Sequence, residues 1–191
     1  MNYYISDLHF RHNNIIRFDS RPFNNIEEME EQLISNWNNK VTNADTVYIL
    51  GDFCWGKQPQ WLDVLKRLNG KKVLIKGNHD LKQYSSAIKM HLSDIKEYKE
   101  IKDGERTVIM CHYPIMCYKK DYDPNVFMLH GHTHITFEQK LVDEWTLQLK
   151  NILRTNPNTV YNQANIINVG CMMPWMDYAP RTLDEILERM R

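Results

Sequence analysis

The fold class of this chain can be inferred from residues 46–80, TVYILGDFCWGKQPQWLDVLKRLNGKKVLIKGNHD. At its two ends it contains short apolar runs, 46–50 and 72–76, whose Val, Ile and Tyr residues are typical of β-strands. Between them an apolar stripe recurs at helical spacing and stops at Gly70, a residue that commonly ends a helix. The stripe consists of Trp61, Leu62, Leu65 and Leu68. A strand, a helix and a second strand in this order predict a layered α/β domain with parallel pairing in at least part of its sheet.

The same alternation continues on both sides of this stretch. Further strands are expected at 3–6, 107–111, 126–129 and 165–169, and their unbroken apolar character predicts strands covered on both faces. Helical patterns cover 25–40, where Asn25 and Glu28 predict an N-terminal cap, 137–153 and 182–191. We expect the apolar stripes of these helices to face the core, including the stripe of Leu141, Trp145 and Leu149. Residues 154–163 are expected to form a polar loop.

Composition narrows the class of protein. The 191 residues favour a single domain over 1–191, and 42% hydrophobic with 25% charged residues is typical of a globular protein. The 24 basic and 24 acidic residues give a net charge of zero, which disfavours nucleic acid as a partner without excluding it. The sequence shows no signal-peptide pattern, no apolar run long enough to span a membrane and no C-x-x-C pair. We therefore expect a cytoplasmic protein without a disulfide framework.

Side chains able to bind a metal follow each of the first five predicted strands. They are Asp7 and His9, Asp52, Asn78 with His79 and Asp80, His112, and finally His130, His132 and His134. Taken alone, the run HGHTH could be a surface cluster, a buried hydrogen-bonded set or a metal site. In open α/β sheets the binding crevice lies outside the carboxyl ends of the strands, so the five strand ends together favour a distributed metal site. Gly51, Gly77 and Gly131 each precede a candidate ligand, where a sharp turn or a close backbone approach excludes a Cβ atom.

Five short blocks in this chain resemble, in order, the signature blocks of the calcineurin-like metallophosphoesterases, and in particular their short bacterial and phage members. The blocks are DLH (7–9), GDF (51–53), GNHD (77–80), HYP (112–114) and GHTH (131–134), with a further echo in NVG (168–170). The resemblance implies a layered β-sheet sandwich flanked by helices, with a metal site at the carboxyl ends of the strands. The segment at about 135–164 is longer than in compact members. We expect a helical insertion there that packs as an extra helix, the alternative being a cap over the site.

The resemblance also implies a centre of two divalent ions. The first would be held by Asp7, His9, Asp52 and His134, and the second by Asp52, Asn78, His112 and His132, with Asp52 bridging. A single carboxylate can span two ions about 3.5–4 Å apart, a spacing suited to in-line displacement at phosphorus. Nitrogen and oxygen ligands favour manganese, iron or zinc. His130 precedes the matched block, and we expect it to be packed or hydrogen-bonded rather than a ligand.

The expected reaction is hydrolysis of a phosphate mono- or diester by a metal-bound hydroxide. His79 would protonate the leaving group as a general acid, and Asp80 would orient His79. His12, Arg11 and Arg21 are candidate contacts to the substrate, the alternative for each being a solvated basic residue. Cys54, Cys111 and Cys171 are expected to be small buried hydrophobic residues.

The expected partner is a small phosphate ester, with nucleotides among the candidates. Two other functions stay open: a nuclease of the same family, and a protein-binding scaffold with the same fold and no catalysis. Selectivity is expected in the loops 54–60, 113–125 and 135–164, which include the aromatic residues Trp55, Tyr113, Tyr118 and Tyr122. The sequence does not indicate the oligomeric state.

Overall fold

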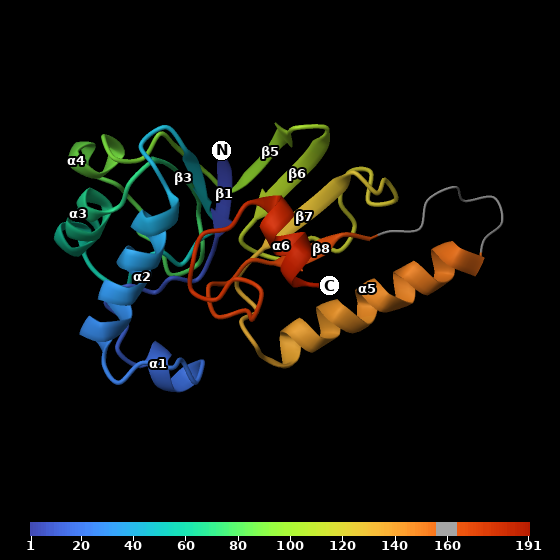
Figure 1. The fold of residues 1–191 in the computed structure, drawn as a ribbon, viewed down its shortest axis with the longest axis horizontal. Helices are drawn as coiled ribbons and strands as arrows, with labels where there is room; N and C mark the ends of the chain where they lie inside the picture. The colour runs from blue at the N-terminus through green and yellow to red at the C-terminus, as the bar shows by residue number, and fades with distance from the viewer. Residues whose placement is uncertain (156–163) are drawn as a thin grey trace.

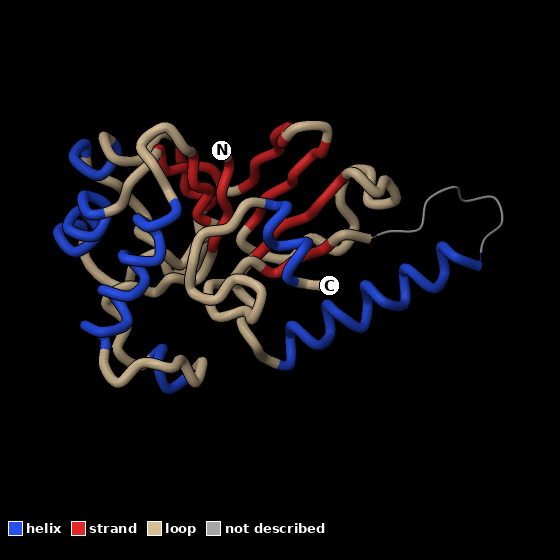
Figure 2. The backbone as a smooth tube through the Cα atoms, in the orientation of Figure 1, coloured by secondary structure: helices blue, strands red, loops and turns tan. Residues whose placement is uncertain are grey.

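The protein folds into two four-stranded sheets flanked by helices (Figures 1 and 2). The structure is a computed structural model that describes residues 1–155 and 164–191. This is the α/β architecture predicted from the sequence. The helix expected at 137–153 runs from Phe137 to Thr155, so the predicted polar loop begins later than expected. The rest of that loop, 156–163, lies outside the described residues.

The first sheet is entirely parallel, as the stretch 46–80 predicts. Its strands, in spatial order, are β1 (Asn2–Ile5), β2 (Thr46–Ile49), β3 (Lys71–Ile75) and β4 (Asp94–Lys96). The associated helices are α1 (Ile15–Phe18), α2 (Ile26–Lys40), α3 (Gln58–Arg67) and α4 (Ser86–Lys89). Figure 1 shows α2, α3 and α4 on the side of this sheet that faces away from the second sheet.

The second sheet mixes parallel and antiparallel pairs. Its strands are β5 (Tyr98–Asp103), β6 (Arg106–Cys111), β7 (Val126–His130) and β8 (Ile166–Asn168), followed in the chain by α6 (Leu183–Arg189). Only β5 and β6 are antiparallel, joined by a turn at Gly104 with φ +61°. The sequence did not predict β5, because its side chains alternate between half-buried and exposed and its composition is largely charged.

The two sheets join where β1 and β8 end. The backbone N–H of Ser6 donates to the carbonyl of Val169 at 2.9 Å, and the N–H of Cys171 donates to the carbonyl of Ser6 at 2.8 Å. These bonds place the carboxyl ends of the parallel strands of both sheets around one point. The predicted ligands of both halves of the chain can therefore meet.

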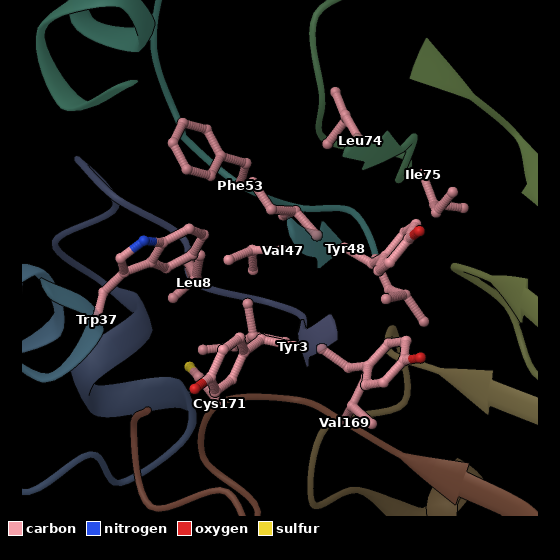
Figure 3. Packing of buried hydrophobic residues seen from close by; sticks show 14 of the residues in the cluster. Tyr3, Leu8, Trp37, Val47, Tyr48, Phe53, Leu74, Ile75, Val169 and Cys171 are labelled. Carbon is pink, nitrogen blue, oxygen red and sulfur yellow. The ribbon is translucent and has the colours of Figure 1, made fainter. Parts of the chain in front are cut away.

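One hydrophobic cluster holds the two sheets together. Figure 3 shows part of it, which includes Trp37 of α2 and Val47 of β2 as well as Val169 and Cys171, which follow β8. Leu129 of β7 also belongs to this cluster, so the core is continuous from one sheet to the other. The predicted cap of α2 is confirmed, because Asn25 Oδ1 accepts the backbone N–H of Glu28 at 2.8 Å.

Helix α5 departs from the prediction that its apolar stripe faces the core. Leu141 is 47% exposed, Trp145 and Leu149 are half-buried, and no α5 residue up to Asn151 belongs to either hydrophobic cluster. Figure 2 shows the helix extending past the second sheet. Helical periodicity identifies an apolar face but carries no information about what covers that face. Within the described residues, no helix has the length and apolar content needed to cross a bilayer.

Candidate metal centre

The predicted ligands meet at the carboxyl ends of the strands in two overlapping groups. Asp7, His9 and His134 form one group, and Asp7, Asp52 and His112 form the other, with ligand atoms within 4.8 Å of one another in each group. Asp52 Oδ2 lies 3.6 Å from His9 Nε2 and 3.6 Å from His112 Nε2. One carboxylate oxygen is therefore placed between the two groups.

Asn78 and His132 complete the second group. Asn78 Oδ1 lies 3.0 Å from His112 Nε2 and 3.0 Å from His132 Nδ1. All seven predicted ligands are thus close to one another, although they come from five separate segments of the chain.

The backbone turns sharply at five of these seven positions. Positive φ angles occur at Asp7 (54°), His9 (51°), Asp52 (51°), His132 (68°) and His134 (47°). Residues other than glycine rarely adopt this region, at a cost of about 1–3 kcal/mol each. Such strain persists only where the surrounding structure imposes it, and it commonly accompanies functional sites. Here it aims successive side chains at one point immediately after each strand.

Two glycines allow the close approach that the sequence predicted. A Cβ atom at Gly131 would collide with the side chains of Ser6 and Asp7, and one at Gly77 would collide with the carboxylate of Asp52. Neither collision involves the far end of a flexible surface side chain. The two positions therefore admit only glycine while both aspartates keep their places.

The imidazoles are oriented by groups behind them. His134 Nδ1 lies 2.7 Å from Asp19 Oδ1, and Asp19 Oδ2 accepts from Arg21 at 2.8 and 3.0 Å. His112 Nδ1 lies 2.7 Å from the carbonyl oxygen of Leu50. Both contacts leave Nε2 free to face the centre, the usual arrangement of histidines that bind metals. Asp19 was missed by the sequence analysis, since it belongs to no matched block and no predicted strand end.

The electrostatics of the centre suit a cation. Asp7 and Asp52 are 0% and 2% exposed, and in the described part of the chain neither carboxylate forms an ion pair with a lysine or arginine. Two buried carboxylates without such a partner are costly unless a positive charge joins them. Burial raises the pKa of Asp52. The donor set of carboxylate, imidazole and amide groups therefore fits a divalent metal.

Metal binding needs a neutral imidazole, and the pKa values of the histidines are shifted in different directions. Burial, reinforced by the positive charge of Arg21, holds the pKa of His9 well below its usual value, and burial also lowers the pKa of His132. Burial alone would lower the pKa of His134, but the carboxylates of Asp19 and Asp7 outweigh it and raise this pKa above the usual value. Neutral imidazoles at His9 and His132 are ready to bind a metal, whereas a metal at His134 would replace a proton.

His79 lies beside the first group. Its backbone N–H donates to Asp52 Oδ1 at 2.9 Å, and its ring centre lies 5.9 Å from that of His9 and 4.9 Å from that of Trp55. Within the described residues, no hydrogen bond joins Asp80 to this ring. The Asp80 carboxylate instead accepts the backbone N–H groups of Gly77, Phe53 and Asp52 at 2.8, 2.9 and 3.2 Å.

The prediction that Asp80 orients His79 is therefore wrong. The Asp80 side chain turns inward, because three backbone donors of two neighbouring loops need an acceptor there. Burial raises the pKa of Asp80 to about 6 despite these bonds. Asp80 ties together the loops that carry Asp52 and Asn78.

Of the three predicted substrate contacts, one lies beside the candidate centre and two are paired with other side chains. Arg21 is 4% exposed and is bound to Asp19 and to backbone carbonyls, so it supports the site from behind and does not reach a substrate. Arg11 pairs with Glu30 and Asp63, so the prediction for Arg11 is not supported either. His12 does lie beside the centre, with its ring 5.5 Å from that of His9 and stacked at 4.4 Å on Trp55.

His130 and the cysteines largely match their predictions. His130 is 0% exposed, and its Nδ1 lies 2.8 Å from the carbonyl oxygen of Gly131, which confirms a packed, hydrogen-bonded histidine. Burial lowers the pKa of His130 to about 4. Cys54 and Cys171 are buried as predicted, while Cys111 is half-buried.

Comparison with known proteins agrees with this geometry. The chain is 39% identical over 134 residues to an uncharacterized protein of Methanocaldococcus jannaschii, covering 69% of this chain and 68% of that protein. It is 26% identical over 162 residues to the Gene 66 protein of Mycobacterium phage L5, covering 69% of this chain and 76% of the phage protein. A crystal structure of a protein of unknown function from Aquifex aeolicus superposes with a TM-score of 0.68 and 27% identity, covering 98% of both chains.

A family model identifies the family to which this chain is related. The model described as calcineurin-like phosphoesterase matches residues 3–175, a range that includes every predicted metal ligand. The protein belongs to the calcineurin-like phosphoesterase family.

Proposed function

We propose that this protein is a metal-dependent phosphoesterase that hydrolyses a phosphate mono- or diester at a centre of two divalent ions. The observation that carries the proposal is the position of Asp52, whose Oδ2 lies 3.6 Å from a nitrogen of His9 and 3.6 Å from a nitrogen of His112. A carboxylate in this place suits a bridge between two cations.

The remaining ligands divide around that bridge. Asp7, His9 and His134 would hold the first ion with Asp52, and Asn78, His112 and His132 would hold the second. Manganese, iron and zinc are the metals that such a donor set favours. Bound divalent ions supply a water nucleophile at neutral pH and neutralise charge on the phosphoryl oxygens.

The side chains around the ligands bind the ester and move protons. His79, held at its backbone by Asp52, is within reach of the first group and donates a proton to the departing oxygen. His12, kept in place by its stacking on Trp55, contacts the phosphate. Its Nδ1 is buried and has no hydrogen-bond partner among the described residues.

A catalytic role is favoured over a scaffold by what surrounds the ligands. A binding scaffold has no need of a carboxylate behind His134, a carbonyl behind His112 or strained backbone at five ligands. The zero net charge favours a small ester over a nucleic acid as substrate.

Metal-stripped protein reloaded separately with Mn²⁺, Zn²⁺ or Fe²⁺ provides the test. We expect at least one metal to restore hydrolysis of bis-p-nitrophenyl phosphate or of p-nitrophenyl phosphate. Asp52→Asn should lose bound metal and turnover together, whereas Asp184→Asn, at an exposed surface aspartate, should keep both. Full metal occupancy in Asp52→Asn would refute the bridge, and a lack of turnover with every metal on both esters would refute the function.

A further inference from the structure

A groove begins at the edge of the second ligand group. It has a volume of about 640 Å³ and runs between α5 and the segment 113–116, with His132 among its lining residues. A ligand in this groove would be in direct contact with a predicted metal ligand. The groove therefore belongs to the reaction centre and is not a separate surface feature.

The walls of the groove are apolar and aromatic. The ring of Tyr113 packs edge-on against that of His132, with 4.6 Å between centres, and from α5 Leu141 and Trp145 face the groove one turn apart. Tyr113 is 46% and Leu141 is 47% exposed. This accounts for Leu141 and Trp145 of the α5 stripe, which line one side of the groove instead of reaching the core.

The charges in the groove restrict what it accepts. Glu138 and Glu144 of α5 line it, and its described lining contains no lysine or arginine. A second phosphate group would be repelled by these carboxylates. An uncharged ring is compatible with them, and a ring that carries N–H groups could donate to Glu138, Glu144 or Gln148.

The proton donor lies toward the other ligand group. His79 and Trp55 form a separate recess with Lys57 and with Asn78 of the second group. Within it the His79 ring lies beside Trp55 and beside His9 of the first group, and none of the recess residues lines the groove. A leaving group protonated by His79 departs on that side. The groove beside His132 is then left for a substituent that stays on phosphorus, which a monoester does not have.

We infer, on the basis of the proposed function, that the substrate is a phosphodiester whose retained substituent carries an uncharged aromatic ring, and that this ring lies in the groove against Trp145 and Tyr113. Water adds its oxygen to phosphorus, and the bond from phosphorus to the leaving oxygen breaks. That oxygen takes a proton from His79, and the attacking water supplies a proton that restores His79. The products are an alcohol and the monoester of the retained substituent.

Three diesters with the same leaving group test the inference on the metal-loaded protein: methyl, phenyl and thymidine-5′ p-nitrophenyl phosphate. After correction for their uncatalysed rates, we expect kcat/KM for an aromatic diester to exceed that for the methyl diester by roughly tenfold, the effect of about one stacked ring. A preference for phenyl indicates an aryl substituent, and a preference for thymidine indicates a nucleoside.

Substitutions in the groove test whether the preference for an aromatic substituent arises there. Trp145→Ala and Tyr113→Ala should lower the aromatic-to-methyl ratio by roughly tenfold, mainly through KM, because a stacked ring binds the ground and transition states alike. Trp145→Leu, which keeps an apolar side chain on α5, should behave like Trp145→Ala. Leu147→Ala is the matched control, since Leu147 lies on the same helix, is 60% exposed and does not line the groove.

The outcomes separate this inference from the proposed function. Hydrolysis of p-nitrophenyl phosphate without hydrolysis of any diester overturns the inference and keeps the function. Equal kcat/KM for the methyl and aromatic diesters, or an equal loss for all three in Trp145→Ala, also overturns the inference alone. An absence of metal-restored hydrolysis of every ester overturns both.

Discussion

The Nδ1 atom of His134 lies 2.7 Å from Oδ1 of Asp19, and this contact decides which imidazole nitrogen faces the candidate metal centre. His134 Nε2 then lies 3.7 Å from Asp7 Oδ1 and 3.4 Å from His9 Nε2. Asp19 is itself held by the buried guanidinium of Arg21. A chain of charge-assisted contacts thus runs from the interior to the predicted first ion and holds His134 in a single orientation.

Replacement of Asp19 by asparagine should weaken metal binding although every ligand remains. Partners behind a ligand typically contribute about 10–100-fold to metal affinity, and we expect a loss of that size. Calorimetric titration of metal-stripped protein with Zn²⁺ or Mn²⁺ measures it, with Asp184→Asn as the surface control. If Asp19→Asn and the control have equal affinities, Asp19 has no orienting role.

Removal of the His79 imidazole should preserve the metals and slow the reaction. We expect His79→Ala to bind metal normally and to hydrolyse an ester with an alkyl leaving group about 10²–10⁴-fold more slowly, because such a leaving group needs a proton. The loss should be smaller with p-nitrophenyl esters, whose leaving group departs as an anion. His91→Ala is the matched control, and an unchanged rate on the alkyl ester would exclude His79 as general acid.

Asp80 should contribute to stability rather than to proton transfer. Asp80→Ala leaves the N–H groups of Gly77, Phe53 and Asp52 without their acceptor, each costing about 1–3 kcal/mol when buried. We expect a fall of a few kcal/mol in the free energy of unfolding, measured with urea on metal-free protein. Asp80→Asn, which keeps one acceptor oxygen, should lie between the alanine variant and the original chain. Full stability of Asp80→Ala would contradict this role.

His130 should make the fold sensitive to acid. Burial lowers the pKa of His130 from about 6.5 to about 4, so only the unfolded chain binds a proton here between these pH values. This contribution to stability is complete above about pH 6.5 and is lost as the pH falls toward 4, by an amount on the order of 3 kcal/mol. His130→Gln should therefore lose less stability than the original metal-free chain between pH 7 and pH 4.5. Parallel stability curves for the two proteins would show that His130 does not titrate in this way.

The sequence determined the strands and the positions of the candidate ligands, because both depend on local chemistry. The stretch 46–80 contains a strand, a helix and a strand, and β2 and β3 pair in parallel as its apolar patterns predict. Each candidate ligand lies within four residues of a strand end, so the position of that end places Asp52 or His112 without knowledge of the rest of the chain. The close approach at Gly131 was predictable for the same reason.

The partners of those candidate ligands depended on long-range packing, which the sequence does not reveal. Asp19 and His134 are 115 residues apart, and no periodicity relates them. Asp80 turned to backbone donors and Arg21 to Asp19, because unpaired buried donors and charges cost more free energy than any local preference supplies. The apolar face of α5 was visible in the sequence, but whether it met the core or a groove depended on packing between distant segments. That packing placed Trp145 in a groove that His132 also lines.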